Sequence, residues 1–532
     1  MTTDGGDPIT DRGIVYAKTA ENADPTISGP FATRVSTGGS IGAFTIAVGS
    51  LASSTGYSFK AFASNNVGTT YSTVATFTTL TPLCPTITLG ELSSTIAGTA
   101  YSDSAAAGGG AAPYGYAVTS GTLTAGLVLN PTTGAVTGTP PAIASSTFEI
   151  TATDSNGCTG SATYTVAAGS VIAPANLVIR EFRPRGAASE ALDEYVVIHN
   201  RTASTLMIAA VDGSAGYCVA ATGGNLIFTI PNGTVFPPHA NFLAVNSVRF
   251  SLGTPHDASW STDIDDNDGL ALFKSSTQFT TPNRLDSVGR VGGAAPYVEG
   301  TGLPSLGPIT LGQHAWVRKY PASAGAGVSD TQNNANDFVL VAVDAATYGP
   351  SSVKAVLGGP SSEGLASARE RTNAEIPMTL VEPSTGQNGS YNRAAIPASG
   401  GNPAAIELRR RFTNNTGADL TTLRFKVSYL TTKNSTPAGA DLRPVFSSDV
   451  ALVTPTNGPV LARGLSLDQA SIFTTLSGGG VPEGGLNSVL VVDLAALPGG
   501  KLAAGSSVDV NFKVFAHAAG SFNFWLVPEG KP

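Results

Sequence analysis

Short runs of β-branched and aromatic residues, broken every few positions by Gly, Pro, Asn or Asp, recur along the whole chain. Residues 43–48 (AFTIAV) and 423–427 (LRFKV) are examples. Runs of about four to eight such residues between turn residues are typical of strands in sandwiches. Long helices need charged and long apolar residues, but only 12% of the residues are charged, whereas there are 62 Gly and 34 Pro. The sequence therefore predicts an all-β protein.

The length of 532 residues is too great for one compact core. Domains typically have about 100–200 residues, so roughly three to five domains are expected. A hydrophobic content of 42% excludes general disorder. We expect tandem immunoglobulin-like or fibronectin-like β-sandwich domains in a linear array.

The charge balance restricts the partners. A net charge of −8 argues against a nucleic-acid partner, because phosphate binding needs a basic face. No apolar run approaches the ~20 residues that span a bilayer, so no membrane span is expected. The first residues have neither the basic nor the apolar region of a signal peptide, although the chain otherwise has the composition of a secreted protein.

Residues 82–168 contain three connected motifs, at 112–121 (APYGYAVTSG), 126–140 (GLVLNPTTGAVTGTP) and 148–158 (FEITATDSNGC). Together they resemble the PIG-type (putative-immunoglobulin) domain of bacterial surface proteins. The resemblance spans the whole domain and implies an immunoglobulin-like spacer or adhesion module without catalytic residues. It also implies a secreted bacterial protein, located outside the cell or on the cell surface.

The three cysteines are Cys84, Cys158 and Cys218. Cys84 opens the PIG-type domain and Cys158 lies near its end, so we expect a disulfide that joins the first and last strands. Closing a loop of roughly 75 residues stabilises a fold by about 4 kcal/mol in the chain-entropy model. Such a bridge also indicates an oxidising compartment. Cys218 is left over, either as a buried small hydrophobe or as an intermolecular thiol.

Residues 1–80 contain the segments 11–17 (DRGIVYA), 43–48 and 51–65, and these resemble the middle and late strands of a fibronectin type III-like domain. Tyr57 fits the tyrosine corner of such domains. The family carries further strands ahead of this segment, so we expect an incomplete sandwich with an unpaired edge. Two explanations stay open: the chain is a fragment of a longer secreted protein, or another subunit donates the missing strand.

Residues 174–345 carry a succession of motifs that begins with 177–182 (LVIREF) and 192–200 (LDEYVVIHN) and ends with 330–338 (DTQNNANDF). This order resembles the lamin-tail domain of secreted bacterial proteins, which is an immunoglobulin-like sandwich of no fixed function. Ile198 and His199 stand where the family usually has an acidic residue before Asn. We expect the following residues, 345–357, to form a linker.

Residues 358–532 are similar to the C-terminal regions of long secreted bacterial proteins that carry lamin-tail domains, on motifs such as 408–417 (LRRRFTNNTG) and 521–526 (SFNFWL). We expect a C-terminal β-sandwich region of unknown role. Residues 362–371 are expected to form one short helix, and the charges of Arg409, Arg410 and Arg411 are expected to be solvated along a strand.

One acidic loop offers a candidate metal site, at Asp263, Asp265, Asn267 and Asp268. Ca²⁺ takes six to eight oxygen ligands, and alternating carboxylates on a tight loop can supply them. The spacing does not fit an EF-hand, so a plain polar loop is the alternative. Ca²⁺ is the one cofactor considered. A second oxygen-rich turn, with Asp330, Asn333, Asn334 and Asp337, is expected to accept hydrogen bonds from backbone N–H groups.

No catalytic pattern is present in the sequence. The five histidines are scattered singly, without metal-binding spacing, and no nucleophile elbow accompanies them. We therefore expect a non-enzymatic structural protein, a subunit of a bacterial surface filament, fibre or layer that self-associates into a polymer, with strand complementation as a route of assembly. The alternatives are a monomeric adhesin that binds a cell-surface or glycan ligand, with a loop aromatic such as Trp316 at its site, and an accessory region of a secreted hydrolase.

Overall fold

The computed structural model describes residues 6–80, 84–186, 190–306, 312–321, 327–437, 439–473 and 480–532. In these ranges strands dominate, and the one α-helix, α1 (Asn334–Asp337), has four residues. The prediction of an all-β protein is confirmed. The 3-10 helices are η1 (Thr281–Asn283), η2 (Pro383–Thr385), η3 (Ala470–Ile472), η4 (Leu494–Ala496) and η5 (Pro498–Gly500). None of these helices is long and apolar enough to cross a membrane.

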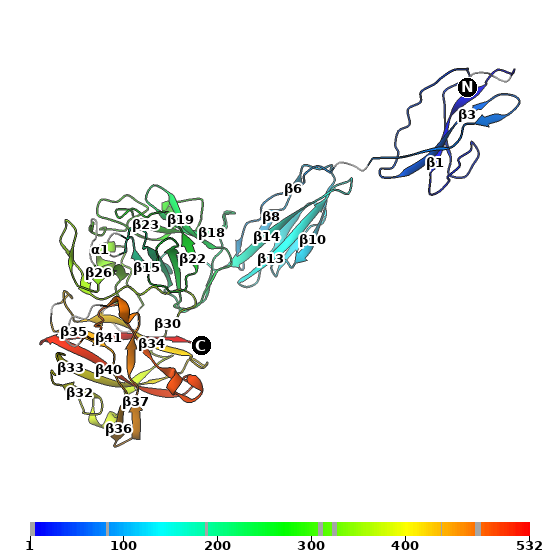
Figure 1. Ribbon diagram of the computed structural model, residues 1–532. Coiled ribbons are helices and arrows are strands. Elements are labelled where there is room, and N and C mark those ends of the chain that lie inside the picture. The colour runs from blue at the N-terminus through cyan, green and yellow to red at the C-terminus, as the bar shows by residue number, and fades with distance from the viewer. Residues whose placement is uncertain are drawn as a thin grey trace.

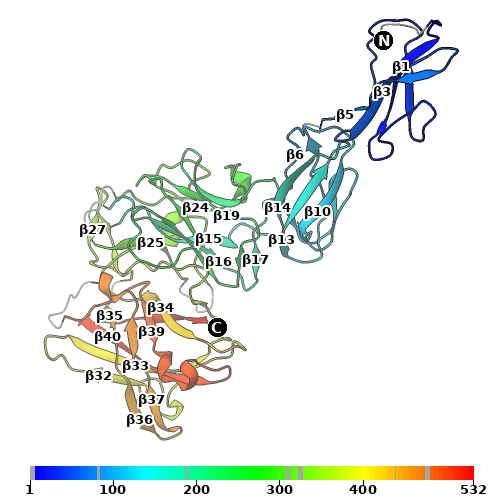
Figure 2. The same ribbon diagram turned by 45° about the vertical axis from the view of Figure 1, so that its right-hand side comes forward.

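The chain forms four β-units in succession (Figure 1). The first and second units follow one another in an extended line, whereas the third and fourth lie side by side in both views (Figure 2). The prediction of tandem β-sandwich domains is confirmed. The fourth unit packs along the third instead of extending the line.

The first unit, described over residues 6–80, contains a single sheet in the order β2-β1-β3-β4, with β5 also paired to β3. Tyr57 lies on β3, and its hydroxyl accepts a hydrogen bond from Ala52 N at 3.0 Å, which confirms the expected tyrosine corner. The prediction of a strand at residues 43–48 was wrong, because this segment pairs with no strand of the described residues. The strands are β1 (Asp11–Lys18), β2 (Thr33–Ser36), β3 (Gly56–Ser64), β4 (Thr69–Tyr71) and β5 (Ala75–Thr78).

The second unit is a two-sheet sandwich. Its main sheet has the order β10-β13-β14-β7, its second sheet has the order β11-β12-β8, and β6 pairs with β9. Phe148 and Ile150 of β13 are fully buried between the sheets, as their alternation predicts. The strands are β6 (Thr88–Leu89), β7 (Thr95–Ile96), β8 (Tyr101–Ser104), β9 (Ala107–Gly108), β10 (Gly115–Gly121), β11 (Leu127–Leu129), β12 (Ala135–Gly138), β13 (Ala144–Thr153) and β14 (Thr159–Gly169).

The third unit packs a seven-stranded sheet, in the order β22-β21-β16-β15-β25-β26-β29, against a four-stranded sheet, β19-β18-β23-β24. The two inner faces enclose one large apolar core. The strands are β15 (Leu177–Arg183), β16 (Tyr195–Asn200), β17 (Leu206–Met207), β18 (Gly216–Ala221), β19 (Asn225–Pro231), β20 (Val235–Phe236), β21 (Asn241–Asn246), β22 (Ala258–Trp260), β23 (Leu270–Phe273), β24 (Arg284–Val288), β25 (His314–Arg318), β26 (Phe338–Ala342), β27 (Thr347–Tyr348), β28 (Val353–Lys354) and β29 (Val356–Leu357).

The linker expected at residues 345–357 is not a linker. These residues form β27, β28 and β29, and Val356 pairs with Val341 of β26 in parallel register. Tyr348 and Leu357 are buried in the process. The sequence predicts a linker here because its apolar residues are interrupted by Gly, Pro and Ser. In the structure, β29 instead forms one edge of the seven-stranded sheet.

The fourth unit packs sheet β30-β41-β34-β39-β38 against sheet β31-β33-β40-β35, to which β32 adds through β33. The strands are β30 (Arg369–Glu370), β31 (Met378–Leu380), β32 (Arg393–Ile396), β33 (Ala404–Thr413), β34 (Thr422–Leu430), β35 (Asp441–Val445), β36 (Val450–Thr454), β37 (Gly458–Ala462), β38 (Leu465–Leu467), β39 (Val489–Val492), β40 (Ser507–Ala518) and β41 (Phe524–Lys531).

Two expectations for the fourth unit were wrong. Residues 362–371 form no helix; they run between the third and fourth units and end in β30. Arg409 is not solvated but 5% exposed, because its guanidinium pairs with Glu407 and donates to Ser390 O at 3.0 Å. In both cases the structure depends on contacts with other segments of the fold, and a local sequence pattern does not contain that information.

Candidate functional site

The first unit has an open edge. In residues 43–48 the side chains alternate between exposed and half-buried, as in a strand that lies on a core. Within the described chain, however, no backbone N–H or C=O group of this segment takes part in a hydrogen bond. An extended segment with free backbone groups is a template for a further strand.

The first unit also exposes part of its aromatic surface. Phe44 lies under the guanidinium of Arg12, 5.2 Å from it. On the sheet, Tyr57 and Phe77 are stacked with ring centroids 5.6 Å apart, and Phe77 is still 42% exposed. Ile41, next to the segment, is 57% exposed. The first unit therefore exposes apolar side chains in addition to the unpaired backbone.

The acidic loop of the third unit is held by contacts within the loop and with neighbouring segments. Asn267 N donates to Asp265 Oδ1 at 2.9 Å, and Ser305 donates to Asn267 Oδ1 at 3.1 Å. Among the described residues, Asp263, Asp265 and Asp268 do not bring three carboxylates within 4.8 Å of one another. A Ca²⁺ site at Asp263, Asp265, Asn267 and Asp268 stays a prediction.

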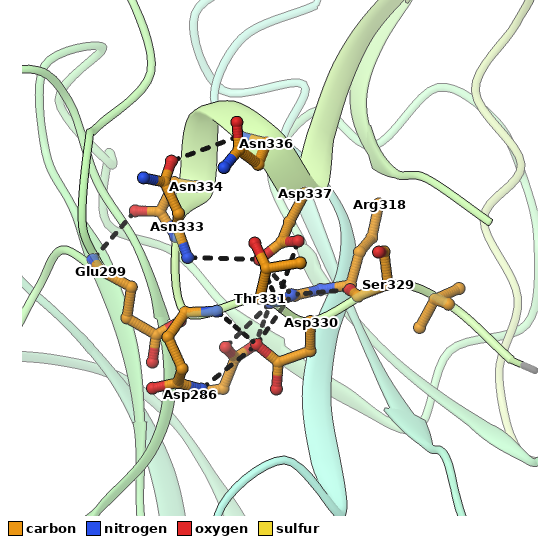
Figure 3. Close-up of polar contacts among 12 residues, drawn as sticks. Asp286, Glu299, Arg318, Ser329, Asp330, Thr331, Asn333, Asn334, Asn336 and Asp337 are labelled. Carbon is orange, nitrogen blue, oxygen red and sulfur yellow. Dashed lines mark hydrogen bonds and ion pairs between the residues drawn. The ribbon is translucent and has the colours of Figure 1, made fainter. Parts of the chain in front are cut away.

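Three other carboxylates do converge. One oxygen each of Asp286, Glu299 and Asp330 lies within 4.8 Å of the other two (Figure 3). Asp286 projects from β24, and the other two come from the segments that follow β24 and precede α1. Asp286 is fully buried, Glu299 is 3% exposed, and the Asp330 side chain is 0% exposed.

Arginines neutralise part of this cluster. Arg318 of β25 holds both oxygens of Asp286 at 2.7 and 2.8 Å and lies 3.5 Å from Asp330 and from Asp337. Burial, together with the charge of Asp286, raises the pKa of Glu299 to about 9. Burial also raises the pKa of Asp286 despite its contact with Arg318. Burial therefore favours the protonated form of Glu299, whereas Asp286 has the Arg318 guanidinium as its partner.

The oxygen-rich turn beside this cluster does what the sequence predicts. Asp337 accepts hydrogen bonds from Thr331 N, and Asn334 Oδ1 accepts from Gly289 N and Glu299 N at 3.0 and 3.1 Å. Asn333 accepts from Asn336 N. The additional approach of Asp330 to Asp286 and Glu299 was missed, because the three residues are far apart in sequence.

A buried ionic network joins the third and fourth units. Glu363, on the connecting segment, is 2% exposed and forms ion pairs with Arg424 and Lys426 of β34, the latter at 2.8 Å. Asn241 of β21 donates to Glu363 Oε2 at 2.9 Å. Although burial opposes ionisation, the charges of Arg424, Lys426 and Arg180 hold the pKa of Glu363 at about 2. Glu363 therefore binds both sandwiches as a carboxylate.

Arg180 of β15 extends the network from the third unit. It is 1% exposed and lies 2.8 Å from Glu370 of β30. On the other side, Glu529 of β41 pairs with Arg424 at 2.7 Å, and burial raises the pKa of Glu529 to about 7. One sequence signal could have indicated this interface: Arg180 and Glu181 interrupt an apolar strand, and all residues of that strand are buried.

An apolar cleft opens beside the network. Its volume is about 380 Å³, and Tyr320, Met378 and Trp525 are among the residues that line it. Trp525 is half-buried and its ring lies 5.3 Å from that of Tyr429. Trp316, which we expected on a loop, lies in β25 and is 3% exposed, so the idea that it forms a ligand site is wrong.

The cysteines behave as the sequence predicts. Cys84 and Cys158 form a disulfide, with Cα atoms 5.4 Å apart. The bridge joins the chain ahead of β6 to the turn between β13 and β14. Cys218 is free and fully buried, and burial raises its pKa to about 12. It is a buried small side chain, not an exposed thiol.

Comparisons with known proteins identify one part of the chain. Residues 75–169, which include the second unit, match the family described as "Putative Ig domain". Among solved structures, the crystal structure of the protocadherin GammaB4 extracellular domain matches at 12% identity and a TM-score of 0.14, covering 71% of this chain and 57% of that chain. So low a TM-score carries no argument about fold or function. No curated protein matches the chain.

Proposed function

We propose that this chain is a non-enzymatic, extracellular structural protein of a bacterial surface, which assembles by strand addition at the edge of its first unit. The observation that carries the proposal is the unpaired extended backbone of residues 43–48. Strand addition supplies affinity through main-chain hydrogen bonds and specificity through alternate side chains. The occupant is a strand from a second copy of the chain.

The remaining units fit a structural role. The immunoglobulin-type second unit carries a disulfide, which is common in secreted proteins. The third and fourth units are fixed to each other by buried charges, so they form a broad, rigid end. We further propose that the first unit belongs to the fibronectin type III-like class and that the third is a lamin-tail-like domain.

The experiment compares the full chain with a double variant, Thr45→Lys/Ala47→Lys. Both side chains are exposed, and lysines on an edge strand oppose pairing with another strand. We expect the unmodified chain to form elongated assemblies at high concentration, measured by light scattering and negative-stain microscopy, and the double variant to stay monomeric.

The matched control is Asn66→Lys/Val67→Lys, which adds the same charge to an exposed loop of the same unit. This control should assemble like the unmodified chain. An unmodified chain that stays monomeric at high concentration contradicts the proposal, and so does equal loss of assembly in both double variants, since that would be a general effect of charge.

A second function is favoured by one observation, the apolar cleft that is lined by Tyr320 and Trp525. Aromatic rings beside polar groups are a common way to hold a sugar ring, and Glu370 and Arg371 line the same cleft. In this alternative the chain is a glycan-binding adhesin. Glycan-array binding that is lost in Trp525→Ala, by a chain that stays monomeric, would support it over assembly.

A further inference from the structure

The carboxylate cluster of the third unit has features that internal hydrogen bonds do not explain. We propose that Asp286, Glu299 and Asp330 form a binding site for one Ca²⁺ ion. The site is separate from the acidic loop at residues 263–269 and independent of the proposed assembly.

The first observation is geometric. Three carboxylate oxygens lie within 4.8 Å of one another in the interior of the unit, where Figure 3 shows the three side chains directed toward one another. Two of the buried oxygens, Glu299 Oε2 and Asp330 Oδ2, accept no hydrogen bond. Asp330 Oδ2 lies 3.6 Å from the Arg201 guanidinium, whereas the Arg284 contact of Glu299 is made by Oε1 and not by Oε2. Buried polar atoms nearly always have a partner, so Glu299 Oε2 indicates a missing one.

The second observation is the balance of charge. Four carboxylates gather here, because Asp337 also faces the cluster, and three guanidinium groups face them. Arg284 and Arg201 are 3.5 and 3.6 Å from their carboxylates and make no hydrogen bond to them. Of the four carboxylates, Asp286 alone accepts hydrogen bonds from a guanidinium group in the described chain. A buried carboxylate requires a counter-charge or a proton.

The ligand chemistry selects the ion. All three donors are carboxylate oxygens, and hard cations such as Ca²⁺ prefer such donors over the His and Cys ligands of zinc. Mg²⁺ demands near-octahedral geometry, whereas Ca²⁺ accepts irregular sets. Because Arg318 already occupies both oxygens of Asp286, the set is irregular. Ca²⁺ is therefore the better occupant.

A bound ion would tie separate segments of the sandwich together. Asp286 belongs to the four-stranded sheet, and Asp330 lies just ahead of α1 and β26 of the seven-stranded sheet. An ion that binds only the folded state stabilises it by mass action. At a free concentration of 100 times Kd, the ratio of folded to unfolded protein rises about 100-fold.

The test uses the full chain, stripped of metal with a chelator. Calorimetric titration with CaCl₂ should show one bound equivalent, and MgCl₂ should bind more weakly. The unfolding midpoint should rise with added Ca²⁺. In Glu299→Gln, a neutral group of the same shape replaces the carboxyl; we expect the variant to fold, to bind no Ca²⁺, and to show no Ca²⁺-dependent shift. Asp330→Asn should behave in the same way.

The matched control is Asp263→Asn/Asp265→Asn, which removes two charges from the acidic loop and should leave Ca²⁺ binding unchanged. Two results would overturn the proposal. If the unmodified chain shows neither heat nor a midpoint shift at millimolar Ca²⁺, a proton neutralises the cluster instead. If the control loses binding while Glu299→Gln keeps it, the acidic loop is the site.

Discussion

Replacing Glu363 by Gln is the sharpest test of how the third and fourth units are joined. Glu363 is 2% exposed and contacts Arg424, Lys426 at 2.8 Å and Asn241 at 2.9 Å. Glutamine preserves the shape but removes the charge, and its amide N–H groups point at cations. Lys426, which is 0% exposed, then lacks its shortest ion pair.

Removing one partner of a buried ion pair costs about 3–5 kcal/mol, because the other charge stays buried without compensation. Glu529 reduces this cost. Burial raises the pKa of Glu529 to about 7, although the charge of Arg424 opposes the rise. Glu529 is therefore only partly ionised near neutral pH. When the charge of Glu363 is removed, Glu529 can lose its proton and become fully ionised. We therefore expect a loss near the lower end, about 3 kcal/mol.

The assay is urea unfolding followed by tryptophan fluorescence. All three tryptophans, Trp260, Trp316 and Trp525, lie in the third and fourth units, so the signal reports on this pair. The control is Asp468→Asn, whose side chain is 44% exposed and 3.8 Å from Arg424; its effect should stay below about 0.5 kcal/mol. A Glu363→Gln chain as stable as the control would refute the inference that buried charges hold the two units together.

Three further predictions concern single residues. Burial lowers the pKa of His199 to about 3, so folded His199 stays neutral while the unfolded chain takes up a proton. Stability present above pH 6.5 is lost as pH falls toward 3, and between pH 6.5 and 5 this loss is about 1.6 kcal/mol. Between these two pH values, the free energy of unfolding of His199→Gln should therefore fall by about 1.6 kcal/mol less than that of the unmodified chain, measured by urea titration. Cys84→Ser should lower the free energy of unfolding of the second unit by about 4 kcal/mol, measured by calorimetry, and an unchanged transition would contradict the role of the disulfide. Cys218 should react with a thiol reagent only after unfolding, because the folded thiol is buried and its pKa is raised to about 12; rapid labelling of the native chain would contradict this.

Local patterns predicted the strands well. Two-residue alternation predicted the core face of β13, where Phe148 and Ile150 are buried. The tyrosine corner at Tyr57 and the disulfide between Cys84 and Cys158 were also foreseen, because each belongs to a motif contained in one unit. Such features depend on contacts within one unit and not on how the units pack together.

Contacts between distant segments could not be predicted in the same way. The sequence predicts a helix for the segment that contains Glu363, whereas the partners of Glu363 lie on β34 and β21. The cluster of Asp286, Glu299 and Asp330 combines residues that no local motif connects. In both cases the chemistry depends on which sheets pack together, and alternation along a strand does not specify that.

The most direct measurement of the proposed assembly is hydrogen exchange at residues 43–48. Within the part of the chain that the structure describes, their amides have no hydrogen-bond partner, so they should exchange rapidly in monomeric protein. In assembled material, an added strand would protect them, and exchange across this segment should slow markedly while exchange in the loop at residues 65–68 stays unchanged. Rapid exchange at residues 43–48 in assembled protein would contradict strand addition at this edge.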